Sequence, residues 1–232
     1  MKSFFEFLEE ILVKKIATLA AVASVVAVMF VPGQASAESA ELRITGTITP
    51  TACTLVFTGG GVVDYGKIPA KSLSPTAQTN LPEKSIQLGM TCEAPVLFGF
   101  KVVDERAATA VTSLETIAGH AANKKFGLGA VDGKKIGAYS LQLVSQTADD
   151  GPAVSLESGN GGATWVAFGQ IGLVGDGSKL VSFLTGSGTA PNAHTSVTAD
   201  IRVVTAIDKG SNLPLTQQIP LDGLSTFELV YL

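Results

Sequence analysis

The stretch Glu38-Ser-Ala-Glu-Leu42-Arg-Ile44-Thr-Gly46-Thr-Ile48-Thr-Pro50-Thr-Ala-Cys53 decides how the rest of the chain is interpreted. Leu42, Ile44, Gly46 and Ile48 alternate with polar residues, and in an extended chain this period of two places them on one face. The pattern predicts a half-buried strand. Gly46 is the unusual member of the apolar face, because glycine adds backbone entropy and no packing surface to a strand.

Two interpretations of this stretch follow from its residues. One is an ordinary first strand with a β-bulge at Gly46. The other rests on Pro50, which lacks the N–H that a sheet ladder needs, so the strand is expected to break between Ile48 and Cys53. Residues 38–49 would then form a detachable strand that is partly independent of the chain after it.

The first 37 residues have the features of a secretory signal peptide. Two lysines precede an apolar run over residues 16–31, and small residues at 35–37 form a cleavage site. The alternative is an uncleaved membrane anchor, but the run is shorter than the roughly 20 residues that a spanning helix needs. We therefore expect an exported chain that begins at Glu38. Acidic residues before Val13 leave open whether translation starts at Met1 or near Val13.

The composition indicates a turn-rich β protein. The net charge is −4, which gives no reason to expect a nucleic-acid or anionic-lipid partner. Charged residues make up 16% of the chain and aromatic residues 6%, and the 25 glycines are scattered along it. No repeat or linker divides the chain after the leader, so we expect one β domain over residues 53–232.

Short alternating segments separated by turn signals fill this domain. Apolar faces of period two are formed by Ile86, Leu88, Met90 and Cys92; by Phe98, Phe100 and Val102; by Tyr139, Leu141 and Leu143; and by Ile201, Val203 and Ile207. Glycine-rich turns lie between them, which predicts an all-β antiparallel sandwich. Residues 106–123 lack this alternation and are expected to form a long surface excursion, with room for a helical turn.

Cys53 and Cys92 are the two cysteines of the chain. In an exported protein an even count favours one disulfide over a metal or redox site, and no CxxC motif is present. A reduced pair is the alternative. The alternation aims Cys92 at the same face as its apolar neighbours, so the expected disulfide is a staple in the core.

An alternating apolar segment with a glycine on its buried face, seven residues before a cysteine, resembles the N-terminal donor extension of pilus subunits assembled by the chaperone–usher route. Such subunits also carry a single early disulfide. The resemblance implies an incomplete immunoglobulin-like sandwich whose missing strand is supplied by the neighbouring subunit. It assigns residues 38–52 as the donor extension, with Leu42, Ile44, Gly46 and Ile48 as the donor strand.

A second resemblance comes from motifs inside the domain. Asp104-Glu105-Arg106 after a predicted strand, then Phe126-Gly-Leu-Gly129 and Ile136-Gly-Ala-Tyr139, is similar to a fimbrial-like family long catalogued as a domain of unknown function. That family more often has Asn in the middle of the acidic-to-Arg triplet. Glu105 departs from this pattern.

The chain ends in a predicted strand. Phe227, Leu229 and Tyr231 share one face, and the strand continues to Leu232 at the carboxyl terminus. A plain last strand packed in its own core is one interpretation. The other is that the strand, with its penultimate tyrosine, resembles the pilin signature that a periplasmic chaperone recognises by pairing its own strand alongside.

The usual signs of an enzyme are missing from the sequence. His120 and His194 are its two histidines, and both are expected in exposed loops. Neither a two-histidine metal site nor a Ser/His/Asp triad is supported by the pattern. We therefore predict a protein that is not an enzyme and takes no cofactor.

Together these features predict a structural or minor subunit of a chaperone–usher fimbria, exported through the periplasm to the cell surface, where it supports adhesion. The partners implied by the resemblance are a periplasmic pilus chaperone, an outer-membrane usher and neighbouring pilus subunits. A tip adhesin and a free-standing secreted binding protein are the alternatives. Six strands around an open groove would favour the subunit, and seven in a closed sandwich the free-standing domain.

Overall fold

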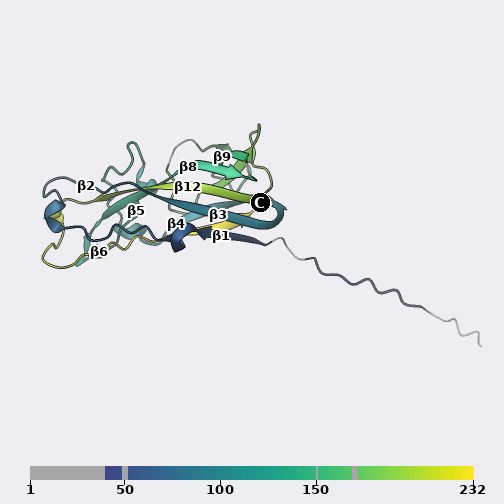
Figure 1. Ribbon diagram of the computed structural model, residues 1–232, viewed down its shortest axis with the longest axis horizontal. Helices are drawn as coiled ribbons and strands as arrows, with labels where there is room; N and C mark the ends of the chain where they lie inside the picture. Colours follow the sequence, from purple (N-terminus) through teal and green to yellow (C-terminus); the bar gives the residue numbers. More distant parts are fainter. Residues whose placement is uncertain (1–39, 49–51, 150, 169–171) are drawn as a thin grey trace, which may run out of the picture. The chain divides into compact units, whose positions relative to one another are not determined.

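The computed structural model describes residues 40–48, 52–149, 151–168 and 172–232 (Figure 1). The chain divides into two units, Met1–Ile48 and Thr49–Leu232. The expected signal peptide and the predicted break at Pro50 lie outside the described residues. Over the described part of the chain, no helix is both long and apolar enough to cross a membrane.

The second unit is built of strands, and its described residues contain no α-helix. The strands are β1 (Cys53–Phe57), β2 (Thr79–Asn80), β3 (Lys84–Val96), β4 (Phe98–Asp104), β5 (Phe126–Gly127), β6 (Ala130–Val131), β7 (Lys134–Lys135), β8 (Gly137–Ala148), β9 (Gly151–Ser158), β10 (Val166–Ala167), β11 (Leu180–Thr185), β12 (His194–Ile207) and β13 (Ser225–Tyr231). Short 3-10 turns are η2 (Thr58–Gly61), η3 (Ala70–Ser72), η4 (Ala107–Thr109), η5 (Ala122–Lys124) and η6 (Gly210–Asn212). The all-β prediction is confirmed.

The main sheet follows the order β1-β3-β12-β8-β9-β11-β4-β13, and every neighbouring pair is antiparallel. Among the described strands, its two halves pair with each other only at the β8–β9 hairpin, through Thr147↔Pro152 and Ala148↔Gly151. The halves β1-β3-β12-β8 and β9-β11-β4-β13 therefore form the two faces of a sandwich. β6 and β7 form a separate two-stranded ribbon.

This path contains eight strands rather than the six or seven that the sequence led us to expect. Eight strands match neither count, so the number of strands does not separate the two alternatives. What distinguishes an open from a closed sandwich is therefore the state of the two ends of the path. These ends, β1 and β13, are not paired with each other over the described residues.

The core lies between the two halves and confirms the predicted inward faces. Leu88 and Met90 of β3 are fully buried, as are Phe100 of β4 and Ile201 of β12. These side chains belong to one apolar cluster with Phe183 of β11, so both halves contribute to the same core. Period-two patterning therefore located the interior strands correctly.

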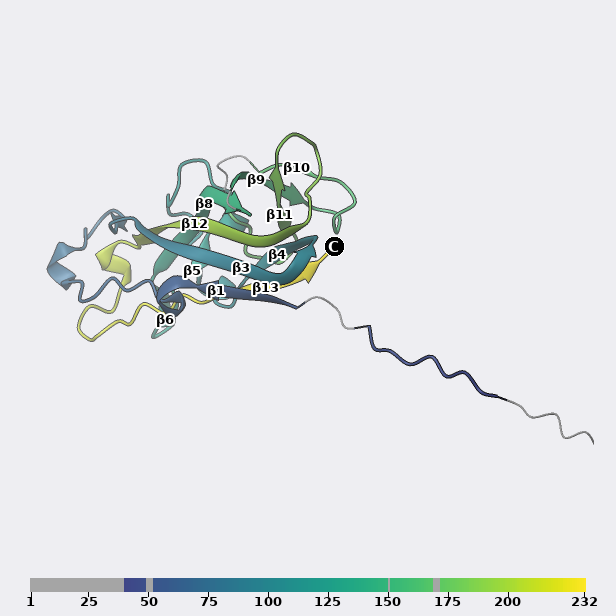
Figure 2. The ribbon, with the colours of Figure 1, turned by 45° about the vertical axis from the view of Figure 1, so that its right-hand side comes forward.

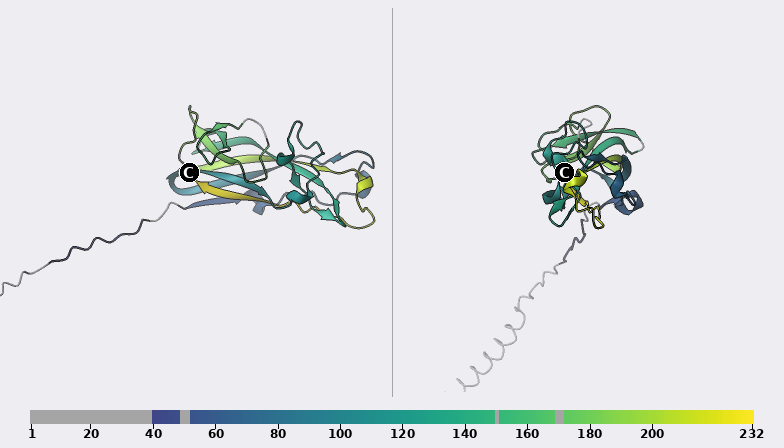
Figure 3. Two further views of the ribbon diagram at one scale, coloured as in Figure 1. Left: turned by 180° about the vertical axis from the view of Figure 1, so that it is seen from behind. Right: turned by 90° about the vertical axis from the view of Figure 1, so that its left-hand side faces the viewer.

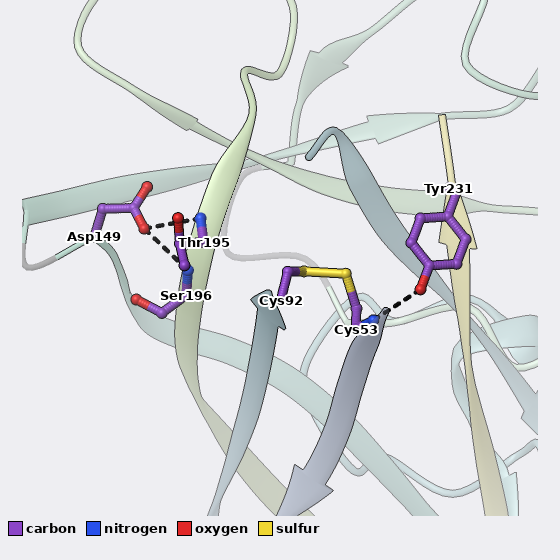
Figure 4. The surroundings of a disulfide bond; sticks show 6 residues. All are labelled: Cys53, Cys92, Asp149, Thr195, Ser196 and Tyr231. Atoms are coloured by element: carbon purple, nitrogen blue, oxygen red, sulfur yellow. Dashed lines mark hydrogen bonds between the residues drawn. A yellow bond between two sulfur atoms is a disulfide. The ribbon is translucent and has the colours of Figure 1, made fainter. Parts of the chain in front are cut away.

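Cys53 and Cys92 form the predicted disulfide. They lie directly opposite each other in the register of β1 and β3, and Cys92 is buried in the core (Figure 4). The expectation for residues 106–123 was only partly right. The segment contains a 3-10 turn, but Ala110 and Leu114 are buried against the domain, so it is more than a surface excursion.

Candidate functional site

The two end strands of the sheet lie side by side without a backbone ladder between them (Figures 2 and 3). The rings of Phe57 on β1 and Phe227 on β13 meet edge to face, with centroids 4.9 Å apart. At the other end of the two strands, the Cys53 N–H donates to the Tyr231 hydroxyl oxygen at 2.9 Å (Figure 4). The strands therefore run antiparallel in space, and each leaves one edge unpaired among the described residues.

A cavity of about 210 Å³ opens beyond the Phe57–Phe227 contact, and we call it the groove cavity. Its walls include Phe57 and Gly61 on one side and Gly223, Leu224, Ser225 and Phe227 on the other. Its floor is formed by Ile86, Leu141, Ile201 and Val203, which come from β3, β8 and β12. The gap between the end strands thus reaches the apolar interior of the sandwich. An exposed route into a core is a binding surface or an aggregation hazard.

A larger cavity of about 510 Å³ adjoins the first, and we call it the end cavity. It lies between the segment that follows β1 and the segment that precedes β13. The two cavities share Val63, Tyr65 and Leu221 in their walls. The floor of the end cavity includes Ile207 and Leu213 of a second, smaller apolar cluster. The groove cavity and the end cavity are therefore continuous, and together they extend beyond the end of β1 and the start of β13.

The start of β13 is held in place by the motif residues of the domain. One carboxylate oxygen of Asp104 accepts from the Arg106 N–H and the other from the Gly127 N–H, each at 2.8 Å. Burial raises the pKa of Asp104, although these two backbone donors lower it. The Glu105 N–H donates to the Leu224 carbonyl at 3.0 Å. Asp104 and its neighbour thereby fix the segment that leads into β13.

Arg106 and Glu105 reach the same segment with their side chains. The Arg106 guanidinium donates to both carboxylate oxygens of Asp222, at 2.8 and 3.2 Å, and this pairing lowers the pKa of Asp222. The Thr226 hydroxyl donates to the Glu105 carboxylate at 2.8 Å. Glu105, the departure from the family pattern, is therefore an acceptor for a hydroxyl on β13. We call Asp104, Arg106 and Asp222 the β13 anchor.

The glycines of the two other motifs allow close backbone approach at this anchor. A Cβ at Gly127 would overlap the Arg106 carbonyl, and a Cβ at Gly137 would overlap the Ala206 carbonyl. Gly129 has a φ of +90°, a conformation that other residues rarely adopt. The motifs that carried the family resemblance thus meet in space beside the groove cavity, which the sequence alone did not show.

The predicted donor segment has the exposure that a detachable strand requires. Residues 40–48 carry no strand assignment, and Leu42, Ile44 and Ile48 are 89, 89 and 99% exposed. A Cβ at Gly46 would have no neighbour within 4 Å. The first described strand of the domain's sheet is β1, which begins at Cys53, so residues 40–48 do not form a described strand of that sheet.

The predicted C-terminal residues divide into two pairs. Phe227 and Leu229 are partly buried and pack against the core, whereas Tyr231 and Leu232 are 51 and 40% exposed. Sequence reasoning missed Phe57, although the alternation of Cys53 with Leu55 and Phe57 contained the signal. It also missed Asp222, whose partner Arg106 is far away in the sequence and leaves no local pattern.

Both histidines are buried rather than exposed, which corrects the prediction from sequence. His194 is 3% exposed, and its Nδ1 lies 2.9 Å from an Asp149 carboxylate oxygen. The Nε2 of His120 accepts from the Gly172 N–H at 3.0 Å. Each ring is thus held by a hydrogen bond to a residue at least 45 positions away in the sequence, which sequence spacing did not reveal. Among the described residues, no group of three or more His, Cys, Asp or Glu side chains could hold a metal ion.

Comparison with known proteins places these motifs in a family. Residues 42–140 match the family model described as "Protein of unknown function (DUF1120)", and this range contains the three motifs around the β13 anchor. Uncharacterized protein YhcF of Escherichia coli (strain K12) is 25% identical over 221 residues, covering 85% of this chain and 92% of YhcF. Protein GltF of the same strain is 31% identical over 251 residues, covering 94% of this chain and 99% of GltF. Given this identity over nearly the full length of both proteins, the chain belongs to the family of Protein GltF.

Proposed function

We propose that this protein is a structural or minor subunit of a chaperone–usher fimbria and polymerises by donor-strand complementation. One observation carries the proposal. The unpaired edges of β1 and β13 face each other over a cavity whose floor is the core of the sandwich. A strand from another molecule would pair with these edges and cover the floor, which is the β-augmentation mode for which pilins are a known example.

The segment 42–48 of a neighbouring copy fits this gap in length and direction. It has as many residues as β13, which spans seven, whereas β1 spans five. Because β1 and β13 run antiparallel, an inserted strand must be parallel to one of them. Antiparallel pairing is slightly more stable per residue, so the inserted strand gains most by running antiparallel to the longer β13.

Full overlap in this direction sets a register. Ile48 then lies opposite Ser225 at the groove cavity, and Gly46 lies opposite Phe227. Directly opposed residues share a face, so Gly46 would cross where the Phe227 ring meets Phe57, at 4.9 Å between centroids. This register gives a physical reason for a glycine on the apolar face of the donor segment, because the passage there is narrow.

The energy available to insertion is mainly apolar burial. Leu42, Ile44 and Ile48 are almost fully exposed in the single chain. Burying each of them stabilises the complex by about 1.5–3 kcal/mol before the cost of ordering the segment is counted. The backbone hydrogen bonds of a new ladder satisfy the free edges of β1 and β13 in addition.

The same groove explains the proposed partners. A subunit with an uncovered groove exposes its core, so it needs a periplasmic chaperone until an outer-membrane usher brings it to the next subunit. We propose export through the periplasm to the cell surface and a role in adhesion there. A free-standing binding protein would have its end strands joined to each other, and the described strands are not joined. No observation favours a tip adhesin.

Two changes to β13 test this proposal. Phe227→Glu places a charge in the apolar contact with Phe57, and deletion of Tyr231 and Leu232 removes the exposed end of the strand. We expect either change to abolish chaperone capture and to leave the subunit degraded in the periplasm. Glu228→Ala, on the opposite, exposed face of β13, is the control and should leave the yield unchanged. A normal yield of soluble, monomeric protein from either test variant would count against the proposal.

A further inference from the structure

We infer that the end cavity is a second contact surface between neighbouring subunits, and that it receives the disulfide end of the next copy of this chain. This end is defined by Cys53, Cys92 and Tyr231, which lie together where β1 begins and β13 finishes (Figure 4), and by Leu232, which follows Tyr231 in the chain. The inference rests on the proposed insertion of segment 42–48, and it adds a surface that the inserted strand itself does not touch.

The first step is the length of the chain that joins the donor segment to its own domain. Ile48 and Cys53 are separated by four residues, and a fully extended chain spans at most about 3.6 Å per residue. The Cys53 of the donating subunit must therefore lie within about 18 Å of its Ile48. When Ile48 occupies the groove cavity, the donating domain is held directly beside it.

The second step is the direction in which this tether leaves the groove cavity. In a strand antiparallel to β13, residues after Ile48 continue past Ser225 toward the segment that precedes β13. That segment forms one wall of the end cavity, and the two cavities share Val63, Tyr65 and Leu221. The donating domain is therefore held on the side of the groove cavity where the end cavity lies, and its disulfide end is the part that the tether keeps nearest.

The third step is that this arrangement propagates. The loops around the end cavity lie at the end of the domain away from its own C-terminus (Figure 1). A subunit can thus accept a neighbour at the end cavity while its own donor segment leaves from the disulfide end. Such a head-to-tail contact uses two different surfaces and continues as an open fibre. The opposite strand direction would place the neighbour at the end from which the chain's own donor segment leaves.

The two surfaces that would meet are both exposed and partly apolar. Val62 and Leu215 of the end cavity are 71 and 38% exposed, although both are large apolar side chains. At the disulfide end, Tyr231 and Leu232 are 51 and 40% exposed. Their association would remove apolar area from water on both sides, which is the usual reason for such patches on an assembling protein.

Val62→Glu and Leu215→Glu test the inference on two separate loops, with Val166→Glu on β10 as a control of similar exposure at 63%. Two measurements are made on each full-length protein. The first is the affinity for a synthetic peptide of residues 38–48, which lacks both the tether and the domain. The second is polymer formation by the protein itself, followed by analytical ultracentrifugation. Melting temperatures establish that each variant is folded.

We expect all three variants to bind the peptide within about twofold of the parent protein, because the groove cavity is intact. We expect Val62→Glu and Leu215→Glu to slow polymer formation at least about tenfold, because a charge is buried at the contact between domains. Polymer formation by both variants at the rate of Val166→Glu would overturn the inference while leaving donor-strand insertion intact. Failure of the peptide to bind the parent protein would instead refute the proposed function, and the inference with it.

Discussion

Replacing Gly46 by leucine separates a donor strand from an ordinary strand, because the two accounts place the added side chain in different surroundings. In the single chain a Cβ at Gly46 has no neighbour within 4 Å, and residues 40–48 carry no strand assignment. Gly46→Leu should therefore leave the melting temperature of the subunit unchanged. In the polymer the same side chain would have to pass the Phe57–Phe227 contact of the neighbouring subunit.

The size of the effect follows from overpacking. Extra methylene groups in a filled space cost about 1–3 kcal/mol, which weakens an association by about five- to 150-fold. Thr47→Leu is the matched control, because it adds a similar side chain to the polar face of the same segment. Melting temperature and polymer length are measured on the same preparation of each variant. Normal polymers from Gly46→Leu, or a lowered melting temperature with normal polymers, would refute the donor-strand reasoning.

Three further predictions concern the stability of the domain. Reducing the disulfide, which closes a loop with a sequence separation of 39, should lower the free energy of unfolding by up to about 4 kcal/mol in a chemical denaturation measured with and without reductant. Asp104→Asn should lower the free energy of unfolding by about 1–3 kcal/mol, because the amide has one acceptor oxygen and leaves either the Gly127 or the Arg106 N–H unpaired. Asp222→Asn, at an exposed position, should lower it by less than about 1 kcal/mol. Burial, with nearby positive charges, lowers the pKa of His120, so the folded state favours the neutral ring that accepts from the Gly172 N–H. The contribution of His120 to the free energy of unfolding should be constant above about pH 6.5 and should fall by at most about 1.4 kcal/mol per pH unit below it. Denaturation curves of His120→Gln, measured over the same pH range, should lack this loss. An identical acid dependence in the variant would show that other groups cause it.

The interior strands could be predicted from the sequence because burial on one face of a sheet imposes a period of two. Phe98, Phe100 and Val102 illustrate this, since all three are buried in β4. The cysteines could be paired because Cys92 lies on such an inward face and Cys53 was its single possible partner in the chain. These predictions depend on local pattern and a count, which a single sequence contains.

The parts that sequence reasoning missed depend on contacts between distant residues. Arg106 and Asp222 are separated by 116 positions, and no periodicity connects them. His120 looked like a loop residue, yet it is buried, and its ring lies so close to the Gly172 backbone that a Cβ at position 172 would overlap it. The groove cavity likewise exists only because β1 and β13, at opposite ends of the domain sequence, become neighbours in space.

The most direct test of the central claim is amide hydrogen exchange of the full-length protein with and without a peptide of residues 38–52. The claim is that the unpaired edges of β1 and β13 accept this segment as a strand. In the free protein, the β13 N–H groups that do not bond to β4 and the β1 N–H groups that do not bond to β3 should exchange rapidly. Both sets should become protected when the peptide is added. A peptide carrying Gly46→Leu should give much weaker protection. Unchanged exchange in both strands at saturating peptide, or protection confined to other strands, would contradict the account.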